Sequence, residues 1–91
     1  MVSALHYKIN KAHIAHRVIG KEAVMLNLDN GCYYSLDEIG TKIWKAIDQN
    51  KSMSETVDIL KEEYEVTEEK LKKDISSLIS RLERAKLIIR V

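Results

Sequence analysis

The residues best suited to chemistry in this chain are three histidines, His6, His13 and His16, and one cysteine, Cys32. A zinc site needs three or four such ligands in a tetrahedral arrangement. His13 and His16 are three residues apart, so they lie on opposite faces if the segment is a strand. Cys32 lies too far along the chain to form a recognised zinc spacing. We therefore expect the histidines to be exposed polar positions, without a bound metal.

Covalent catalysis has little support in the sequence. Cys32 follows a turn, and no base is fixed beside it, so we interpret it as a small apolar strand residue. The sequence has no Gly-rich phosphate loop, no Gly-x-Ser-x-Gly and no paired carboxylates in a pocket-like context. With three glycines in all, loops that wrap a cofactor are not expected. We predict a protein that is not an enzyme and that uses no cofactor.

Size and charge set further bounds. Ninety-one residues predict a single domain over 1–91. With 15 basic and 14 acidic residues, the net charge of +1 provides no field that would select nucleic acid or an anionic membrane. No stretch approaches the roughly 20 apolar residues that cross a bilayer, and no signal peptide is recognisable. One cysteine excludes an intramolecular disulfide, and we expect a cytoplasmic protein without a membrane partner.

The first third of the sequence predicts an antiparallel sheet. Val24, Leu26 and Leu28 alternate as in a half-buried strand, and the following Asn30-Gly31 pair favours a hairpin because both residues tolerate positive φ. The expected strands are residues 13–18, 23–28 and 32–36, with a short one at 7–9. Gly20-Lys21 is the expected turn between the first two of the longer strands.

Residues 37–86 predict three helices. Asp37, Ser52 and Thr67 are the expected N-caps, and Ser52 with Glu55 fits a capping box. The third helix has an apolar face, and a short closing strand is expected at 87–90. The result is an α+β class with a winged helix-turn-helix-like outline, in which a three-stranded antiparallel sheet precedes three helices. The apolar face of the third helix consists of Leu71, Ile75, Leu78, Ile79 and Leu82.

A helix-turn-helix outline raises the possibility of a small DNA-binding regulator. The third helix would then enter the major groove through its first two turns, residues 68–74. Glu68, Glu69 and Asp74 would face phosphates there, and no Arg, Asn or Gln is present to read base edges. We therefore keep DNA binding as the alternative from another class and expect no nucleic-acid partner.

The strand at 32–36 is the last before the helices, so a simple meander places it at an edge of the sheet. It contains no Lys, Glu or Pro, the residues that commonly protect such edges. An extended peptide could add to it through main-chain hydrogen bonds. Alternatively, Tyr33 and Tyr34 serve only packing, or residues 87–91 cover the edge. The residues alone leave these possibilities about equal.

The ordered series VMLNLDNGCYYSLDEIGTKIW, residues 24–44, resembles the PqqD-like family. That family combines an apolar strand, an acidic-Gly turn, a Tyr-Tyr-x-Leu strand end and Gly-x-x-Ile-Trp in the first helix. The likeness spans about residues 14–90, and its specificity lies in the order and spacing of the motifs. It continues through residues 55–57, 64–67, 71–75 and 82–88.

The resemblance implies a recognition element for ribosomally made, post-translationally modified peptides. Such domains bind the leader of a precursor peptide, which adds as an antiparallel strand and lies against the third helix. Carried onto this chain, the strand is Cys32–Leu36 and the helix begins at Thr67, with Lys72 placed to meet an acidic leader residue. The expected peptide-binding residues are Cys32, Tyr33, Tyr34, Ser35, Leu36, Leu71, Lys72, Ile75, Ser76 and Ile79.

Two settings within the family are open. A discrete domain of this length is most similar to the standalone leader-binding protein of lasso peptide biosynthesis, which delivers the precursor to a leader peptidase. The alternative is a PqqD-type peptide chaperone that serves a radical S-adenosylmethionine enzyme. The resemblance favours the lasso setting, with a precursor peptide and a modifying enzyme as partners. We expect a monomer or a weak homodimer.

Overall fold

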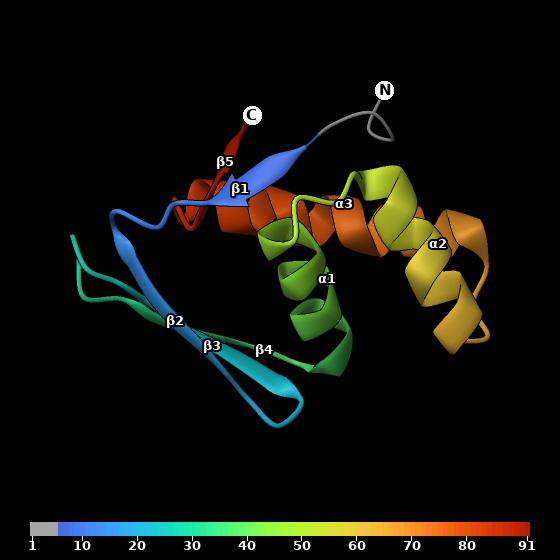
Figure 1. Cartoon of the computed structure of the whole chain (residues 1–91), viewed down its shortest axis with the longest axis horizontal. Helices are drawn as coiled ribbons and strands as arrows, with labels where there is room; N and C mark the ends of the chain where they lie inside the picture. The colour runs from blue at the N-terminus through green and yellow to red at the C-terminus, as the bar shows by residue number, and fades with distance from the viewer. Residues whose placement is uncertain (1–5) are drawn as a thin grey trace.

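The computed structural model describes residues 6–91, which form five strands and three helices (Figure 1). The predicted α+β, winged helix-turn-helix-like class is confirmed. Each segment that the sequence assigned to a strand or a helix contains that element. In chain order the elements are β1 (Tyr7–Ile9), β2 (Ile14–Ile19), β3 (Glu22–Asn27), β4 (Tyr33–Leu36), α1 (Glu38–Asp48), α2 (Met53–Glu63), α3 (Glu68–Arg84) and β5 (Ile88–Arg90).

The three longer strands form an antiparallel sheet in the order β2-β3-β4. The β2–β3 turn has Gly20 at φ +62°, in the left-handed region that glycine adopts without a Cβ penalty. The β3–β4 connection is longer than the Asn-Gly pair suggested, because β3 ends at Asn27 and β4 begins only at Tyr33. Within this loop Gly31 has the positive φ, +73°.

Helix α1 packs on one face of this sheet (Figure 1). The Asp37 side chain caps it by accepting from the backbone N–H of Gly40. One turn later the buried Thr41 hydroxyl accepts from the N–H of Ala23 at 2.7 Å and donates to the carbonyl of Leu36 at 3.3 Å. This hydroxyl therefore ties the start of β3, the end of β4 and the first turn of α1 together.

The other two helices begin at the predicted caps. Ser52 and Glu55 form the full capping box of α2, and the Thr67 hydroxyl accepts from the N–H of Lys70 at the start of α3. Strand β5 returns from α3 and pairs with β1 in a separate two-stranded sheet. Side chains from every strand and helix meet in one buried cluster, with Trp44, Leu60, Ile75 and Leu87 at most 1% exposed.

Candidate peptide-binding site

Strand β4 is an edge of the three-stranded sheet, and among residues 6–91 only β3 pairs with it. The alternative that the carboxy-terminal segment covers this edge does not hold, because β5 pairs with β1. The N–H of Asn27 donates to the carbonyl of Cys32 at 2.8 Å. Because antiparallel hydrogen-bonded pairs recur at every second residue, Tyr33 and Ser35 direct their backbone groups away from β3. The open edge thus offers two residues with unpaired main-chain groups.

A groove runs along this open edge between β4 and α3. It consists of two adjoining hollows of ≈350 and ≈290 Å³, which share Ser35, Leu36 and Arg81 in their walls. An extended peptide needs such a space beside a strand, because an added strand lies about 4.8 Å from its neighbour. We call this space the β4–α3 groove. Its walls include Tyr33, Tyr34, Ser35 and Leu36 of β4, Ile39 and Ile43 of α1, and Asp74, Leu78, Arg81 and Leu82 of α3.

The side chains of β4 alternate between two environments. Leu36 is buried and Tyr34 half-buried on the face that packs toward the helices, whereas Tyr33 is 67% exposed on the opposite face. Cys32 lies just before β4 and is exposed. Partial burial, and then the neighbouring Cys32 thiol, raise the pKa of Tyr34 above its ordinary value of 10.0. A phenol is already neutral and able to donate at neutral pH at that ordinary value, and the shift keeps it so to higher pH. The groove therefore has an uncharged polar group beside an apolar floor.

The expected residues of α3 fall into two groups. Leu71, Ile75 and Ile79 are at most 4% exposed and belong to the core cluster. Lys72 and Ser76 are exposed, and Lys72 pairs with Glu68 at 3.3 Å. None of these five lines the two hollows beside β4. Their role in peptide binding remains a prediction from the resemblance.

The groove wall on α3 is formed by a different set of residues. Asp74, Leu78 and Arg81 lie at i, i+4 and i+7, so they form one line along the helix. Lys72 is nine residues before Arg81, which at about 100° per residue places it on the opposite side of the helix. The sequence contains a signal for this line of residues. Leu78 lies at the margin of the apolar face, and its neighbours along the line, Asp74 and Arg81, are both charged. Sequence alone does not say which flank of the apolar face turns toward β4.

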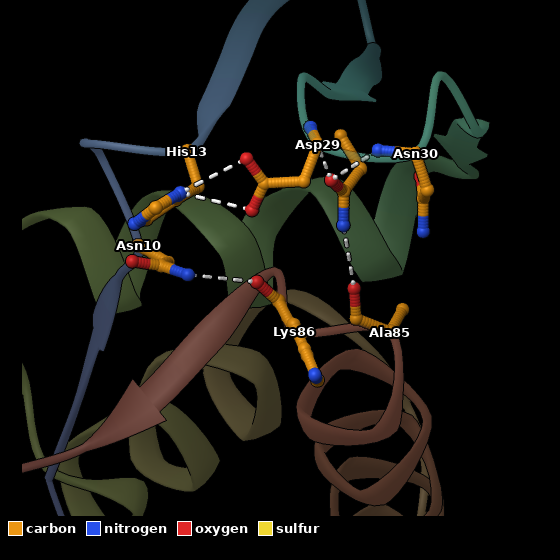
Figure 2. Close-up of polar contacts among 7 residues, drawn as sticks. Asn10, His13, Asp29, Asn30, Ala85 and Lys86 are labelled. Carbon is orange, nitrogen blue, oxygen red and sulfur yellow. Dashed lines mark hydrogen bonds and ion pairs between the residues drawn. The ribbon is translucent and has the colours of Figure 1, made fainter.

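A set of polar contacts fixes one end of the groove (Figure 2). The side-chain amide of Asn27 donates to the carbonyl of Ala85 at 3.2 Å, and that of Asn10 donates to the carbonyl of Lys86 at 3.1 Å. The Asn27 side-chain oxygen also accepts from the N–H groups of Asp29 and Asn30. The Asn27 bonds connect the β3–β4 loop to Ala85, which follows α3 and lines the groove, and the Asn10 bond connects the β1–β2 segment to the next residue, Lys86.

The histidines serve structural contacts. His13 is exposed and pairs with Asp29 at 2.9 Å, as Figure 2 shows. His6 and His16 differ from the exposed positions expected for them, because both are half-buried. The Nδ1 of His16 accepts from the indole N–H of Trp44 at 3.2 Å. Their rings meet edge to face with centroids 5.5 Å apart. The described part of the chain contains no group of three or more His, Cys, Asp or Glu side chains placed to hold a metal.

Two of the three lysines at the start of α3 are engaged by acids of the same helix, and Lys73 is the third. Lys70 contacts Asp74 at 3.2 Å, and Lys72 contacts Glu68 at 3.3 Å. Both pairs are i,i+4 neighbours, so they form within the helix without a partner. This arrangement gives the DNA-binding alternative no additional support. None of the helices that the structure describes has the length and apolar character of a membrane span.

Comparisons with known proteins agree with this architecture. Residues 22–88 match the family described as "Coenzyme PQQ synthesis protein D (PqqD)". The solved structure of TbiB1 in complex with the TbiA(beta) leader peptide superposes with a TM-score of 0.84 at 30% identity, covering 89% of this chain and 93% of that one. A lasso peptide synthetase B1 complexed with its leader peptide also has a TM-score of 0.84, covering 92% and 98%, but at 20% identity it shows likeness of fold alone. No curated protein matches the sequence.

Proposed function

The chain belongs to the PqqD family, and from this premise we propose that it binds the leader segment of a ribosomally made precursor peptide. The observation that carries the proposal is the open edge of β4 beside the β4–α3 groove. TbiB1, 30% identical over most of the chain, is a leader-peptide complex. The protein holds the peptide and performs no reaction itself. The whole chain, 1–91, acts as one recognition domain.

The leader adds as an antiparallel strand to β4. Tyr33 and Ser35 supply outward main-chain donors and acceptors, so four hydrogen bonds are available over this short strand. Side chains on one face of the bound peptide then enter the β4–α3 groove, where Leu36, Leu78 and Ile43 provide apolar surface. Successive side chains of a strand point to opposite faces, so every second side chain of the leader contacts the groove and contributes to specificity.

The bound leader is delivered to a partner that modifies or cleaves the precursor. The likeness to TbiB1 favours a leader peptidase of lasso peptide biosynthesis over a radical S-adenosylmethionine enzyme. Precursors are made by the ribosome, so this handover takes place in the cytoplasm. Co-purification of the chain with each enzyme in the presence of precursor separates the two settings.

A titration of the ¹⁵N-labelled chain with leader peptides tests the proposal. The probes are synthetic leaders of the short peptides encoded beside its gene. Shifts are expected at Tyr33–Leu36 and along residues 74–82 of α3. Ser35→Pro removes an edge-facing N–H and is expected to weaken binding at least roughly ten-fold, because one main-chain hydrogen bond is lost and the strand geometry is perturbed.

Ser35→Ala is the matched control, because it removes the exposed side chain and keeps the N–H. It should bind within about two-fold of the unaltered chain. Leader peptides that do not bind at all, or that shift residues on the far side of the molecule only, would overturn the proposal. Equal binding by the proline and alanine variants would exclude strand addition at this edge.

A further inference from the structure

Arg81 occupies a particular place in the β4–α3 groove. It is exposed, and it lines both hollows, as does Ser35 of the opposite wall. A peptide strand added to β4 passes between these two residues. In residues 6–91 no carboxylate lies within ion-pair distance of Arg81. The guanidinium is therefore a cation that the fold leaves without an anionic partner at the peptide site.

The acidic groups of the same groove have other partners. The Asp37 carboxylate caps α1 by accepting from the N–H of Gly40 at 2.8 Å. The Asp74 carboxylate accepts from the ammonium group of Lys70 at 3.2 Å. Of the three charged groups that line the two hollows, the guanidinium of Arg81 is thus the one without a hydrogen-bonded or ionic partner among residues 6–91.

We propose that Arg81 is a specificity-determining residue that selects peptides with Asp or Glu at one fixed position, the position that faces α3 beside Ser35. The inference rests on the proposed function and sharpens it. Arginine suits this role because its planar guanidinium can bind a carboxylate through two parallel hydrogen bonds. The resemblance alone pointed to Lys72, which lies on the opposite side of α3 and pairs with Glu68.

A carboxylate that reaches Arg81 would be partly shielded from water by the peptide backbone and the groove walls. Such a pair is stronger than an exposed surface ion pair, and we expect loss of either partner to weaken binding roughly 5- to 20-fold. The contribution should also fall with rising salt, because part of the site remains open to solvent.

A displayed library of random 16-residue peptides tests this inference without knowledge of the natural leader. Selection is run separately on the unaltered chain, Arg81→Glu, Arg81→Lys and Lys72→Glu. The unaltered chain should enrich Asp or Glu at one position, Arg81→Glu should enrich Lys or Arg there, and Lys72→Glu should keep the acidic preference. Arg81→Lys should retain it with weaker affinity. All three substitutions are at exposed positions, and thermal unfolding checks that each variant folds.

Each result has a definite meaning. An acidic preference that survives in Arg81→Glu, or that disappears in Lys72→Glu instead, overturns the role of Arg81. A second outcome is that the enriched peptides show no acidic preference but still bind Ser35→Pro more weakly than the unaltered chain. That outcome overturns the role of Arg81 and leaves strand addition to β4 supported. No enriched peptide at all contradicts the proposed function and the inference with it.

Discussion

At the scale of single residues, a hydrogen bond between Tyr64 and Glu38 connects two helices. The Tyr64 hydroxyl, at the end of α2, donates to the Glu38 carboxylate in the first turn of α1 at 2.6 Å. Lys21 lies 3.7 Å from the same carboxylate. The Tyr64 hydrogen bond, and then the charge of Lys21, lower the pKa of Glu38 below its ordinary value of 4.5. The same bond raises the pKa of Tyr64.

Replacing Tyr64 with Phe should return the pKa of Glu38 toward 4.5, because the main cause of its depression is removed. A carboxyl with a depressed pKa in the folded state stabilises the protein above its unfolded pKa. That contribution is lost as the pH falls through the folded value. The difference in the free energy of unfolding between the unaltered chain and Tyr64→Phe should therefore have its full value near neutral pH and decrease below about pH 4.5.

An NMR titration of the glutamate carboxyl carbons measures this shift directly. Glu55 is an internal control, because its pKa is lowered by the Ser52 capping box, which Tyr64→Phe does not touch. An unchanged Glu38 titration in Tyr64→Phe, or a parallel shift of Glu55, would contradict the assignment. The phenyl ring preserves the contact of Lys42 with the aromatic face, 5.2 Å from its centroid.

At the scale of elements, the carboxy-terminal end of α3 is held by the side-chain amides of Asn10 and Asn27. Helix ends leave carbonyl groups without partners inside the helix. Lys86 has a positive φ of +61°, where the chain leaves the helix toward β5. The side-chain amides of Asn27 and Asn10 supply partners for this segment, because they donate to the carbonyls of Ala85 and Lys86. The distance between α3 and the β3–β4 loop is thereby fixed.

Asn27→Asp should destabilise the fold by about 2–3 kcal/mol at neutral pH. The substitution keeps the oxygen that accepts from Asp29 and Asn30 but replaces the donor to Ala85 with an anion at a position only 3% exposed. Asn10→Ala is the comparison, since its bond to Lys86 is exposed and its loss should cost about 0.5–1 kcal/mol. Urea unfolding measures both changes. Equal changes in the free energy of unfolding for the two variants would show that the Asn27 bond is not what holds the β3–β4 loop to the end of α3.

Local sequence signals predicted most elements of the fold. Side-chain caps act within four residues of the helix start, so Asp37, Ser52 and Thr67 located the three helices. The alternation of Val24, Leu26 and Leu28 located β3, but the buried face of this strand is the other one, with Ala23, Met25 and Asn27, and Leu28 is exposed. The pairing of β5 with β1 was not predicted, because it joins Tyr7 to Arg90 and such contacts leave no local pattern.

The candidate site could be predicted only in part for a related reason. The edge position of β4 follows from the order of the strands, and the resemblance predicts that a peptide adds to it. The apolar face of α3 was visible, but Ile75 and Ile79 are used by the core, while the groove takes Leu78 with Arg81 and Asp74. Which flank faces β4 depends on how α3 packs in the shared core, and that is a property of the packed molecule.

At the scale of the whole molecule, both small sheets and all three helices share one core. Ile88 of β5 is 2% exposed within it, whereas its neighbour Ile89 is 40% exposed. A chain with one continuous core should unfold in a single cooperative transition. The fluorescence of Trp44, the only tryptophan, and far-ultraviolet circular dichroism should therefore give coincident urea curves.

Ile88→Ala should shift both curves together and lower the free energy of unfolding by about 3 kcal/mol, because it leaves a cavity in the shared core. Ile89→Ala changes the same residue type one position along, where the side chain is 40% exposed and lies outside the core cluster, and should cost less, about 1 kcal/mol. A shift of one probe without the other would mean that the β1–β5 pair and the β2-β3-β4 sheet unfold separately. Coincident shifts instead mean that both sheets unfold with the β4–α3 groove as one cooperative unit, because the residues that line the groove belong to elements of the same core.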